Sequence, residues 1–354
     1  MDGIDAALVD FSATQPKLIS THAHLWPEAI RQALIKARDL PDSELSSLQE
    51  LDIQTAKIFS EASIKLLEKT SYKAQDITAI GNHGQTIRHR PDIDKPFSLQ
   101  IGNAKTLASL TGIDVVSDFR TADIKAGGQG APLVPAFHQA IFSNEKSNRV
   151  IVNIGGIANI TVLPKANNQT VIGFDCGPGN TLMDAWVTQH KQQPYDSDGR
   201  FAASGKTNAR LLANLLMDHY FQMPPPKSTG FEYFNLDWLH TYDINNVDSA
   251  DVQSTLNDLT ATSIIRAINQ YAEMTDEIYI CGGGVHNRTL MQQLQAMTKY
   301  PVATTEALGI HPDWVEAMAF AWLAYQNTHQ QTGNLPAVTG AGKSVILGDL
   351  TYAA

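Results

Sequence analysis

The sequence predicts an α/β fold with two lobes, and three observations support this prediction. Short apolar runs with strand character alternate with amphipathic helical segments, which is the pattern of largely parallel sheets flanked by helices. The alternation restarts near residue 149, where a strand–glycine–strand hairpin begins. The chain has 354 residues, more than one compact core usually holds. We therefore expect two similar lobes with a cleft between them.

The first lobe is expected to open directly with a strand over residues 4–11. Residues 27–70 carry apolar residues at helical spacing and predict amphipathic helices. Short apolar strands are expected at 77–80 and 113–116, and each runs into polar residues. Polar side chains directly after strands are where an α/β sheet binds ligands.

The second lobe starts with a buried strand over 149–154 and its hairpin partner over 160–163. A third strand over 171–174 leads into a Gly-Pro-Gly turn, and Pro224–Pro226 predict a peripheral loop. The other expected elements are a helix from about 182, a helix over 250–273, a strand over 277–280 and a helix over 313–325.

Composition excludes several classes of function. The formal net charge is −10, which argues against a nucleic-acid-binding protein. No apolar run approaches ~20 residues, and the N-terminus lacks a basic region followed by an apolar one. We therefore expect a cytoplasmic protein that is not in a membrane. Cys176 and Cys281 are far apart and in no Cys/His cluster, so no metal site made of protein ligands is expected.

Three glycine-rich turns follow apolar strands, at 155–156, 177–179 and 282–284. Each alone is more simply a turn of the architecture. Their shared position at strand ends favours a phosphate site, because glycine lets backbone N–H groups approach phosphate oxygens. Residues 339–344 resemble the end of a P-loop, but the required first glycine is Ala337 and only ten residues follow Ser344.

Asp175 is the strongest candidate for a general base, because it stands between an apolar strand and a glycine turn. The alternative is a carboxylate that caps a helix or a turn. Glu316 lies one turn into a nearly apolar helix, and a solvent-facing side chain is the alternative there. His83 and Arg120 follow short strands of the first lobe and are candidates for ligand binding or simply for satisfied loop residues.

The order of these blocks along the chain resembles the anhydro-N-acetylmuramic acid kinase family, and the combination is highly specific although each tripeptide alone is not. The blocks extend from residue 1 to beyond 340. They are Gly81–Ile87, Gln100–Asn103, Asp118–Arg120, Ala126–Pro135, Asn153–Asn159, Gly173–Asn180, Cys281–Gly284 and Glu316–Ala321.

The resemblance implies two ribonuclease-H-like lobes of the actin and sugar-kinase superfamily that close over ATP and Mg²⁺. The lobes would be residues 1–130, on the sugar-binding side, and 131–354, on the nucleotide side, with the helix near 313–326 lining the cleft. Mg²⁺ would come with ATP and not through a protein cluster. The oligomeric state stays open, with a homodimer among the options.

The resemblance also assigns roles to individual residues. Asp175 matches the catalytic base, and His83, Arg120 and Glu316 match the substrate-binding side of the cleft. The nucleotide would be held by Asp2, Gly3, Asp5, Gly155, Gly156, Asn159, Gly177, Gly179, Gly282, Gly283 and Gly284.

The implied reaction converts 1,6-anhydro-N-acetylmuramate, ATP and water to the sugar 6-phosphate and ADP during the recycling of murein. Two alternatives remain at this point, namely a kinase for another sugar and a nucleotide-binding protein without catalysis. In the family a Gly-Thr-Ser turn precedes the Asp-Gly that stands here at Asp2-Gly3. We expect this start to be an internal Met, with a further strand encoded upstream, and the alternative is a genuinely shortened protein.

Overall fold

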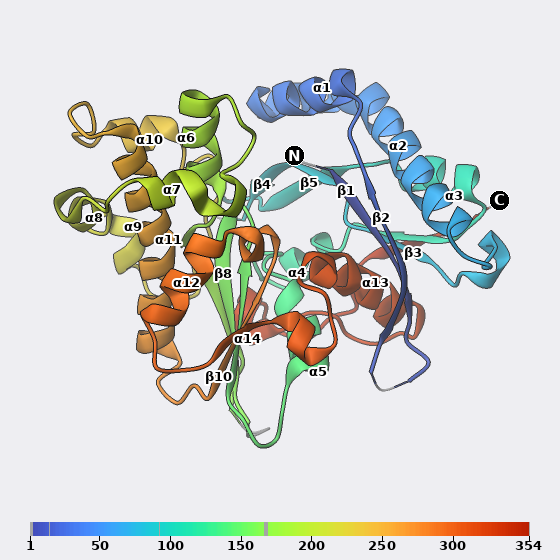
Figure 1. Cartoon of the computed structure of the whole chain (residues 1–354). Coiled ribbons are helices and arrows are strands. Elements are labelled where there is room, and N and C mark those ends of the chain that lie inside the picture. Colours follow the sequence, from blue (N-terminus) through green and yellow to red (C-terminus); the bar gives the residue numbers. More distant parts are fainter. Residues whose placement is uncertain (1–2, 14, 92, 166–168, 354) are drawn as a thin grey trace. The chain divides into compact units, whose positions relative to one another are not determined.

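The computed structural model describes residues 3–13, 15–91, 93–165 and 169–353. The chain forms two compact units (Figure 1). Unit 1 consists of Met1–Phe137 and Glu316–Ala354, and unit 2 is His138–Val315. Each unit combines sheets with helices, so the predicted α/β fold is confirmed.

Unit 2 is built on one continuous mixed sheet with strand order β11-β10-β7-β8-β9. The consecutive strands β7, β8 and β9 pair antiparallel, whereas β10 runs parallel to β7 and β11 parallel to β10. This is the topology of a ribonuclease-H-like lobe. The strands are β7 (Arg149–Ile154), β8 (Ile157–Leu163), β9 (Ile172–Pro178), β10 (Glu277–Cys281) and β11 (Val302–Thr304).

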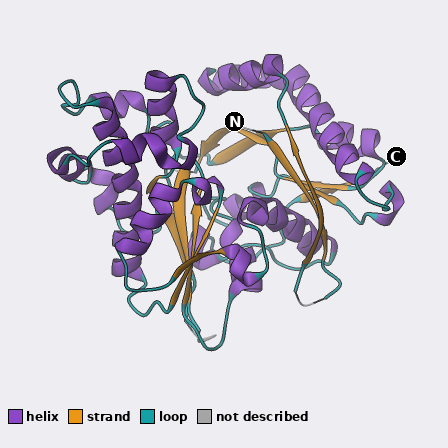
Figure 2. Ribbon diagram, in the orientation of Figure 1, coloured by secondary structure: helices purple, strands orange, loops and turns teal. Residues whose placement is uncertain are grey.

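Helices bury one face of this sheet (Figure 2). Val150, Val152 and Ile154 alternate along β7 toward that face and form one apolar core with residues of α6, α11 and α12. The helices are α6 (Thr181–Lys191), α7 (Arg200–Ser204), α8 (Ala209–Leu215), α9 (His219–Gln222), α10 (Leu236–His240), α11 (Ser249–Tyr271) and α12 (Arg288–Ala296). Short 3-10 helices are η3 (Ser197–Gly199), η4 (Gly283–His286), η5 (Thr305–Leu308) and η6 (Pro312–Trp314).

Unit 1 contains three separate sheets among its described residues, with strand orders β1-β2, β12-β6-β3 and β4-β5. The strands are β1 (Ile4–Asp10), β2 (Lys17–His24), β3 (Ile80–Asn82), β4 (Gln85–Arg90), β5 (Phe97–Ile101), β6 (Val115–Ser117) and β12 (Asp349–Thr351). The helices are α1 (Glu28–Asp39), η1 (Asp42–Leu48), α2 (Gln49–Glu68), η2 (Ala74–Asp76), α3 (Ala104–Thr111), α4 (Thr121–Lys125), α13 (Val315–Thr328) and α14 (Pro336–Thr339), and α5 (Val134–Phe142) crosses into unit 2.

The C-terminal 39 residues of the chain pack with unit 1 (316–354), whereas the sequence led us to expect them in the second lobe, 131–354. Two contacts explain this. β12 pairs antiparallel with β6, and Phe320 of α13 packs against Phe119 at a ring-centroid distance of 5.5 Å. Gly81 of β3 lies so close to the Phe320 carbonyl that any side chain would collide with it. In the part of the chain that the structure describes, no helix is long and apolar enough to span a bilayer.

Candidate functional site

Asp175 lies in β9 of unit 2, in a row of polar residues across the sheet. In the strand register it stands opposite Asn159 of β8, which in turn stands opposite Asn153 of β7. Residues paired in register point to the same side of a sheet. These three half-buried side chains therefore occupy the face opposite to the one that the apolar core covers.

Three hydrogen bonds from one neighbouring segment and one helix hold Asp175. Its Oδ2 accepts the backbone N–H of Thr229 at 3.0 Å, and its own N–H donates to the carbonyl of Lys227 at 3.2 Å. The Tyr220 hydroxyl donates to the Asp175 carbonyl at 2.8 Å. Asn180 occupies the N-cap position of the helix that follows, so the interpretation of Asp175 as its N-cap is wrong.

The surroundings of Asp175 make its carboxyl a weak acid. Desolvation raises its pKa, as does the negative charge of Glu232, whereas the Thr229 N–H and Lys227 lower it, and the net result is a pKa of about 7. A pKa near neutrality suits a general base, because the group is both available as carboxylate and basic enough to take a proton.

The three glycine turns of unit 2 converge at the carboxyl end of β7. Gly282 and Gly284 pack against Ile154, and Gly179 packs against the carbonyl of Gly155. The Asn180 N–H donates to the Gly155 carbonyl at 2.8 Å, and its Nδ2 donates to the Ile154 carbonyl at 3.3 Å. Turns that are far apart in the sequence thus form one backbone-lined surface.

Packing explains some of these glycines and leaves others unexplained. A Cβ at Gly179, Gly282 or Gly284 would collide with β7 or the turn after it, and Gly282 has a φ of +81°. At Gly156 and Gly283 the nearest atoms to such a Cβ lie 3.9 Å away, and both residues are exposed. Their small size leaves the backbone open to a ligand, so the surface fits phosphate groups.

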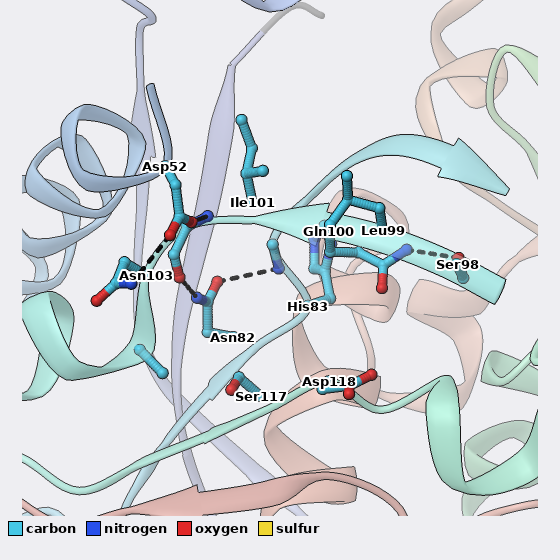
Figure 3. A pocket seen from close by; sticks show the side chains of 13 residues that line it. Asp52, Asn82, His83, Ser98, Leu99, Gln100, Ile101, Asn103, Ser117 and Asp118 are labelled. Atoms are coloured by element: carbon cyan, nitrogen blue, oxygen red, sulfur yellow. Dashed lines mark hydrogen bonds between the residues drawn. The ribbon is translucent and has the colours of Figure 1, made fainter. Parts of the chain in front are cut away.

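Unit 1 holds a polar pocket of about 270 Å³ (Figure 3). It lies where β3, β6 and the β4–β5 hairpin end and α3 begins. Its lining is rich in neutral donors and acceptors. The lining residues are Asp52, Asn82, His83, Gly84, Ser98, Leu99, Gln100, Ile101, Gly102, Asn103, Ala104, Ser117 and Asp118.

Hydrogen bonds fix most of this lining. Asp52 accepts the Gly102 N–H at 2.7 Å and the Asn103 Nδ2 at 2.9 Å, which ties α2 to the start of α3. Gln100 Nε2 donates to the Ser98 hydroxyl at 2.7 Å, so its amide is held along the wall of the pocket. A prearranged polar wall of this kind suits a sugar, which presents many hydroxyl groups.

His83 lines this pocket, and the charges of Arg120 and Glu316 act on His83 from within unit 1. The His83 ring opens to the pocket and packs on Phe320 at 4.5 Å, and Arg120 Nη1 donates to the Gly130 carbonyl at 2.8 Å. Desolvation lowers the pKa of His83 and of Arg120, and the exposed carboxylate of Glu316 opposes both shifts. The structure thus brings together the three residues that the sequence proposed for substrate binding.

Comparisons with known proteins decide the family. A family model described as anhydro-N-acetylmuramic acid kinase matches residues 1–353. The anhydro-N-acetylmuramic acid kinase of Coxiella burnetii (strain RSA 493 / Nine Mile phase I) is 47% identical over 354 residues, which are 99% of this chain and 95% of that protein. The enzyme of that name from Shewanella sp. (strain ANA-3) is 51% identical over 351 residues, covering 98% and 95%.

The chain belongs to the anhydro-N-acetylmuramic acid kinase family. It is therefore a kinase. Solved structures are more distant: the (R)-2-hydroxyglutaryl-CoA dehydratase component A of Acidaminococcus fermentans has a TM-score of 0.40 and 10% identity, over 89% of this chain and 99% of that one. A likeness at that level says nothing about function.

The remaining nucleotide-binding predictions for this kinase concern its first residues. Gly3 and Asp5 are exposed at the start of β1 in unit 1, and Asp2 lies outside the described residues. Their role stays a prediction. Asn159 and Gly177, by contrast, belong to the part of unit 2 where the glycine turns converge. The described residues contain no cluster of three His, Cys, Asp or Glu side chains that could hold a metal ion.

Several residues around Asp175 and in the polar pocket of unit 1 were not predicted from the sequence. The segment 227–229 holds Asp175, yet it follows three prolines that predicted only a peripheral loop. No local pattern links it to β9. Gln100 and Asp118 line the pocket and stand inside the motif blocks that carry the family resemblance, so those blocks were the available signal. Asp52 gave no signal, because it lies in an ordinary amphipathic helix.

Proposed function

We propose that this kinase converts 1,6-anhydro-N-acetylmuramate, ATP and water to N-acetylmuramate 6-phosphate and ADP, in murein recycling. Because the reaction consumes ATP, we place it in the cytoplasm. The observation that carries the proposal is Asp175, a half-buried carboxylate with a pKa of about 7 beside a backbone-lined phosphate surface, in a chain of this family.

The proposed reaction needs a base because an anhydrosugar has no free 6-hydroxyl. Water attacks the anomeric carbon and gives its proton to Asp175. The bond from that carbon to the bridging oxygen breaks, and this oxygen, now attached only to carbon 6, attacks the terminal phosphorus of ATP. The bond from that phosphorus to the oxygen bound to the β-phosphorus breaks, and ADP leaves. One carboxylate thus serves hydrolysis and phosphoryl transfer.

The nucleotide phosphates would contact the glycine turns of unit 2. Phosphoryl transfer depends mainly on positioning and charge neutralisation, which backbone N–H donors provide. The uncrowded positions Gly155, Gly156 and Gly283 support this assignment, because an added Cβ would meet its nearest described atom at 3.7, 3.9 and 3.9 Å, an ordinary contact distance. When bound with ATP, Mg²⁺ would neutralise the phosphate charge.

The sugar would occupy the polar pocket of unit 1. His83 lines that pocket, and Arg120 and Glu316 are close enough for their charges to act on His83, so these three residues would orient the sugar. The guanidinium of Arg120 suits the lactyl carboxylate, because Arg binds carboxylates with two parallel hydrogen bonds. Gln100 and Ser98 would then bind the neutral hydroxyl and amide groups.

The test is turnover of 1,6-anhydro-N-acetylmuramate with ATP in ¹⁸O-labelled water. We expect the label at the anomeric hydroxyl of the sugar 6-phosphate, read by mass spectrometry before exchange, and none in the phosphate. Label in inorganic phosphate would instead indicate plain ATP hydrolysis. Phosphorylation of N-acetylmuramate in preference to its anhydro form would indicate an ordinary sugar kinase.

A further inference from the structure

Lys227 is a buried cation beside the candidate base. The residue is only 7% exposed, and its ammonium donates to the carbonyl of Tyr220 at 3.0 Å. It also lies over the Tyr220 ring at 4.6 Å and near the Phe174 ring at 5.9 Å. In the described part of the chain no carboxylate comes within ion-pair distance of it.

Burial of an ammonium group without a paired carboxylate costs free energy. An uncharged side chain of similar length would fill the same space without that cost. Burial lowers the pKa of Lys227, whereas the negative charge of Asp175 raises it. The charge of Lys227 therefore needs a reason other than packing, and its position supplies one.

The segment that carries Lys227 also holds Asp175. The Lys227 carbonyl accepts the Asp175 N–H at 3.2 Å, and two residues later the Thr229 N–H donates to the Asp175 carboxylate at 3.0 Å. Tyr220 connects the two from the other side, since its carbonyl binds the ammonium and its hydroxyl binds the Asp175 carbonyl.

The charges that face Asp175 differ in sign. Glu232 raises the pKa of Asp175 and Lys227 lowers it. Burial raises the pKa of Cys176 and of Tyr220 far above neutrality, so both are uncharged at the working pH. Among these groups Lys227 is the cation, and it lowers the pKa of Asp175 together with the larger effect of the Thr229 N–H.

We propose that Lys227 is a positioning residue whose buried charge favours the ionised form of Asp175, an inference that rests on the proposed role of Asp175 as general base. Lys227 does not touch the reacting atoms in this account. It acts on the base through space and through the segment 227–229.

The expected effect has a definite sign. A base must be deprotonated, so kcat/KM rises as the pH passes the pKa of Asp175. Removal of a nearby positive charge raises that pKa, which moves the acid limb of the profile upward by roughly one pH unit. The loss should be about tenfold at pH values below both midpoints and should nearly vanish well above them. A purely structural defect would lower the whole curve instead.

The experiment compares pH profiles of kcat/KM for the full chain and four variants, each checked by thermal melting. Lys227→Met removes the charge at similar length, and Lys227→Gln removes it but keeps a donor for the Tyr220 carbonyl. Lys227→Arg keeps the charge and should keep the wild-type midpoint. Lys191→Met is the matched control, because that lysine lies 4.5 Å from the Phe201 ring of the same unit.

An upward shift in Lys227→Met or Lys227→Gln, and not in the other two, supports the proposal. An unshifted midpoint in a folded neutral variant overturns it, as does an equal shift in Lys227→Arg. Asp175→Asn separates this result from the proposed function. If that variant stays active, Asp175 is not the base; if it is inactive while the neutral variants keep their midpoint, only the role of Lys227 is wrong.

Discussion

The two units share one order of elements, but unit 1 has an inserted hairpin and unit 2 has a central strand with no counterpart among the described residues of unit 1. In unit 2 the hairpin β8–β9 is followed by the long helix α11 and then by β10, α12 and β11. In unit 1 the hairpin β1–β2 is followed by the long helix α2 and then by β3, α3 and β6, with the hairpin β4–β5 inserted after β3. In unit 2 the strand β7 joins the two halves into one sheet. Among the described residues of unit 1 no strand joins β1 to β3.

The difference shows which parts are scaffold and which carry chemistry. In unit 2 the central strand β7 is almost fully buried, and the glycine turns and the polar row with Asp175 are arranged around its end. In unit 1 the pocket is built instead from the inserted hairpin and the start of α3. A common α/β framework therefore carries a candidate phosphate surface in one unit and a candidate sugar pocket in the other through different additions at the strand ends.

The largest effect is expected from Asp175→Asn, which tests whether unit 2 carries the base. Loss of a general base should lower turnover by ~10²–10⁴-fold. The fold should persist, because Asn keeps an oxygen for the Thr229 N–H. The folded-state pKa of about 7 lies above the ordinary value of 3.8, so above pH 7 the ionised carboxylate costs stability that Asn does not. We therefore expect the melting temperature at pH 8 to be equal or higher.

The control for this variant is sugar binding by unit 1. Binding of the anhydrosugar, measured by calorimetry, should survive in Asp175→Asn and weaken in Gln100→Ala. If the Asn variant kept more than about a tenth of wild-type turnover, the general base would have to be sought elsewhere.

The next effect concerns how strongly the backbone amides at the centre of each unit are protected from hydrogen exchange. We expect the amides of β1 and β3 to exchange with deuterium roughly a hundredfold faster than those of β7, because β1 and β3 each lack a described partner on one edge. Equal protection of β1 and β7 would contradict the comparison.

The elements that the sequence predicted are those whose apolar pattern is uninterrupted. The strand predicted over 149–154 is confirmed as β7, and the helix predicted over 250–273 is confirmed as α11. The strand predicted over 77–80 lies three residues further on, as β3, because Asn82 completes its pairing with Ser117. The hairpin strand β2 was missed, since its sequence mixes charged, polar and apolar residues.

The same contrast holds for the sites. Position after a predicted strand singled out Asp175, His83 and Arg120. For Asp175 the predicted strand end is wrong, because β9 continues to Pro178 and Asp175 lies within it. What holds Asp175 is not local: its contact with Thr229 joins residues 54 positions apart. Partners of this kind depend on how distant segments pack, and the hydrophobic periodicity of the sequence does not predict such contacts.

A smaller effect is expected from one buried carboxylate in each unit. In unit 1, Asp123 is fully buried and accepts hydrogen bonds from Asn334 at 2.6 Å, Thr339 at 2.7 Å and Gly130 at 2.8 Å. In the Asp123→Asn variant an amide NH2 group replaces one of the two accepting oxygens and faces a hydrogen-bond donor. The variant should therefore lose about 2–3 kcal/mol in the free energy of unfolding. This loss should appear as faster exchange in unit 1 only.

The matched change in unit 2 is Asp196→Asn. Asp196 is also buried and accepts the N–H groups of Phe201 at 2.8 Å and Ala202 at 2.9 Å. The Asp196→Asn variant should speed hydrogen exchange in the helices of unit 2 and leave exchange in unit 1 unchanged. If either variant destabilised both units equally, the two would unfold as one cooperative body and the comparison between them would concern topology alone.

The smallest effect separates glycines that shape unit 2 from those that leave room for a ligand. Gly283 and Gly284 are neighbours in the same turn, but a methyl group at Gly284 would collide with Ile154, while at Gly283 it meets its nearest atom at 3.9 Å. Gly284→Ala should therefore lower the melting temperature, because β7 or the turn must shift. Gly283→Ala should melt like the wild type and weaken ATP binding by roughly three- to tenfold, since displacement of one backbone donor costs about 0.5–1.5 kcal/mol. Calorimetric titration with a non-hydrolysable ATP analogue measures the second effect, and KM for the anhydrosugar should not change. Unaltered affinity in Gly283→Ala, with an intact fold, would move the phosphates away from this turn and leave Gly155 and Gly156 as the candidates.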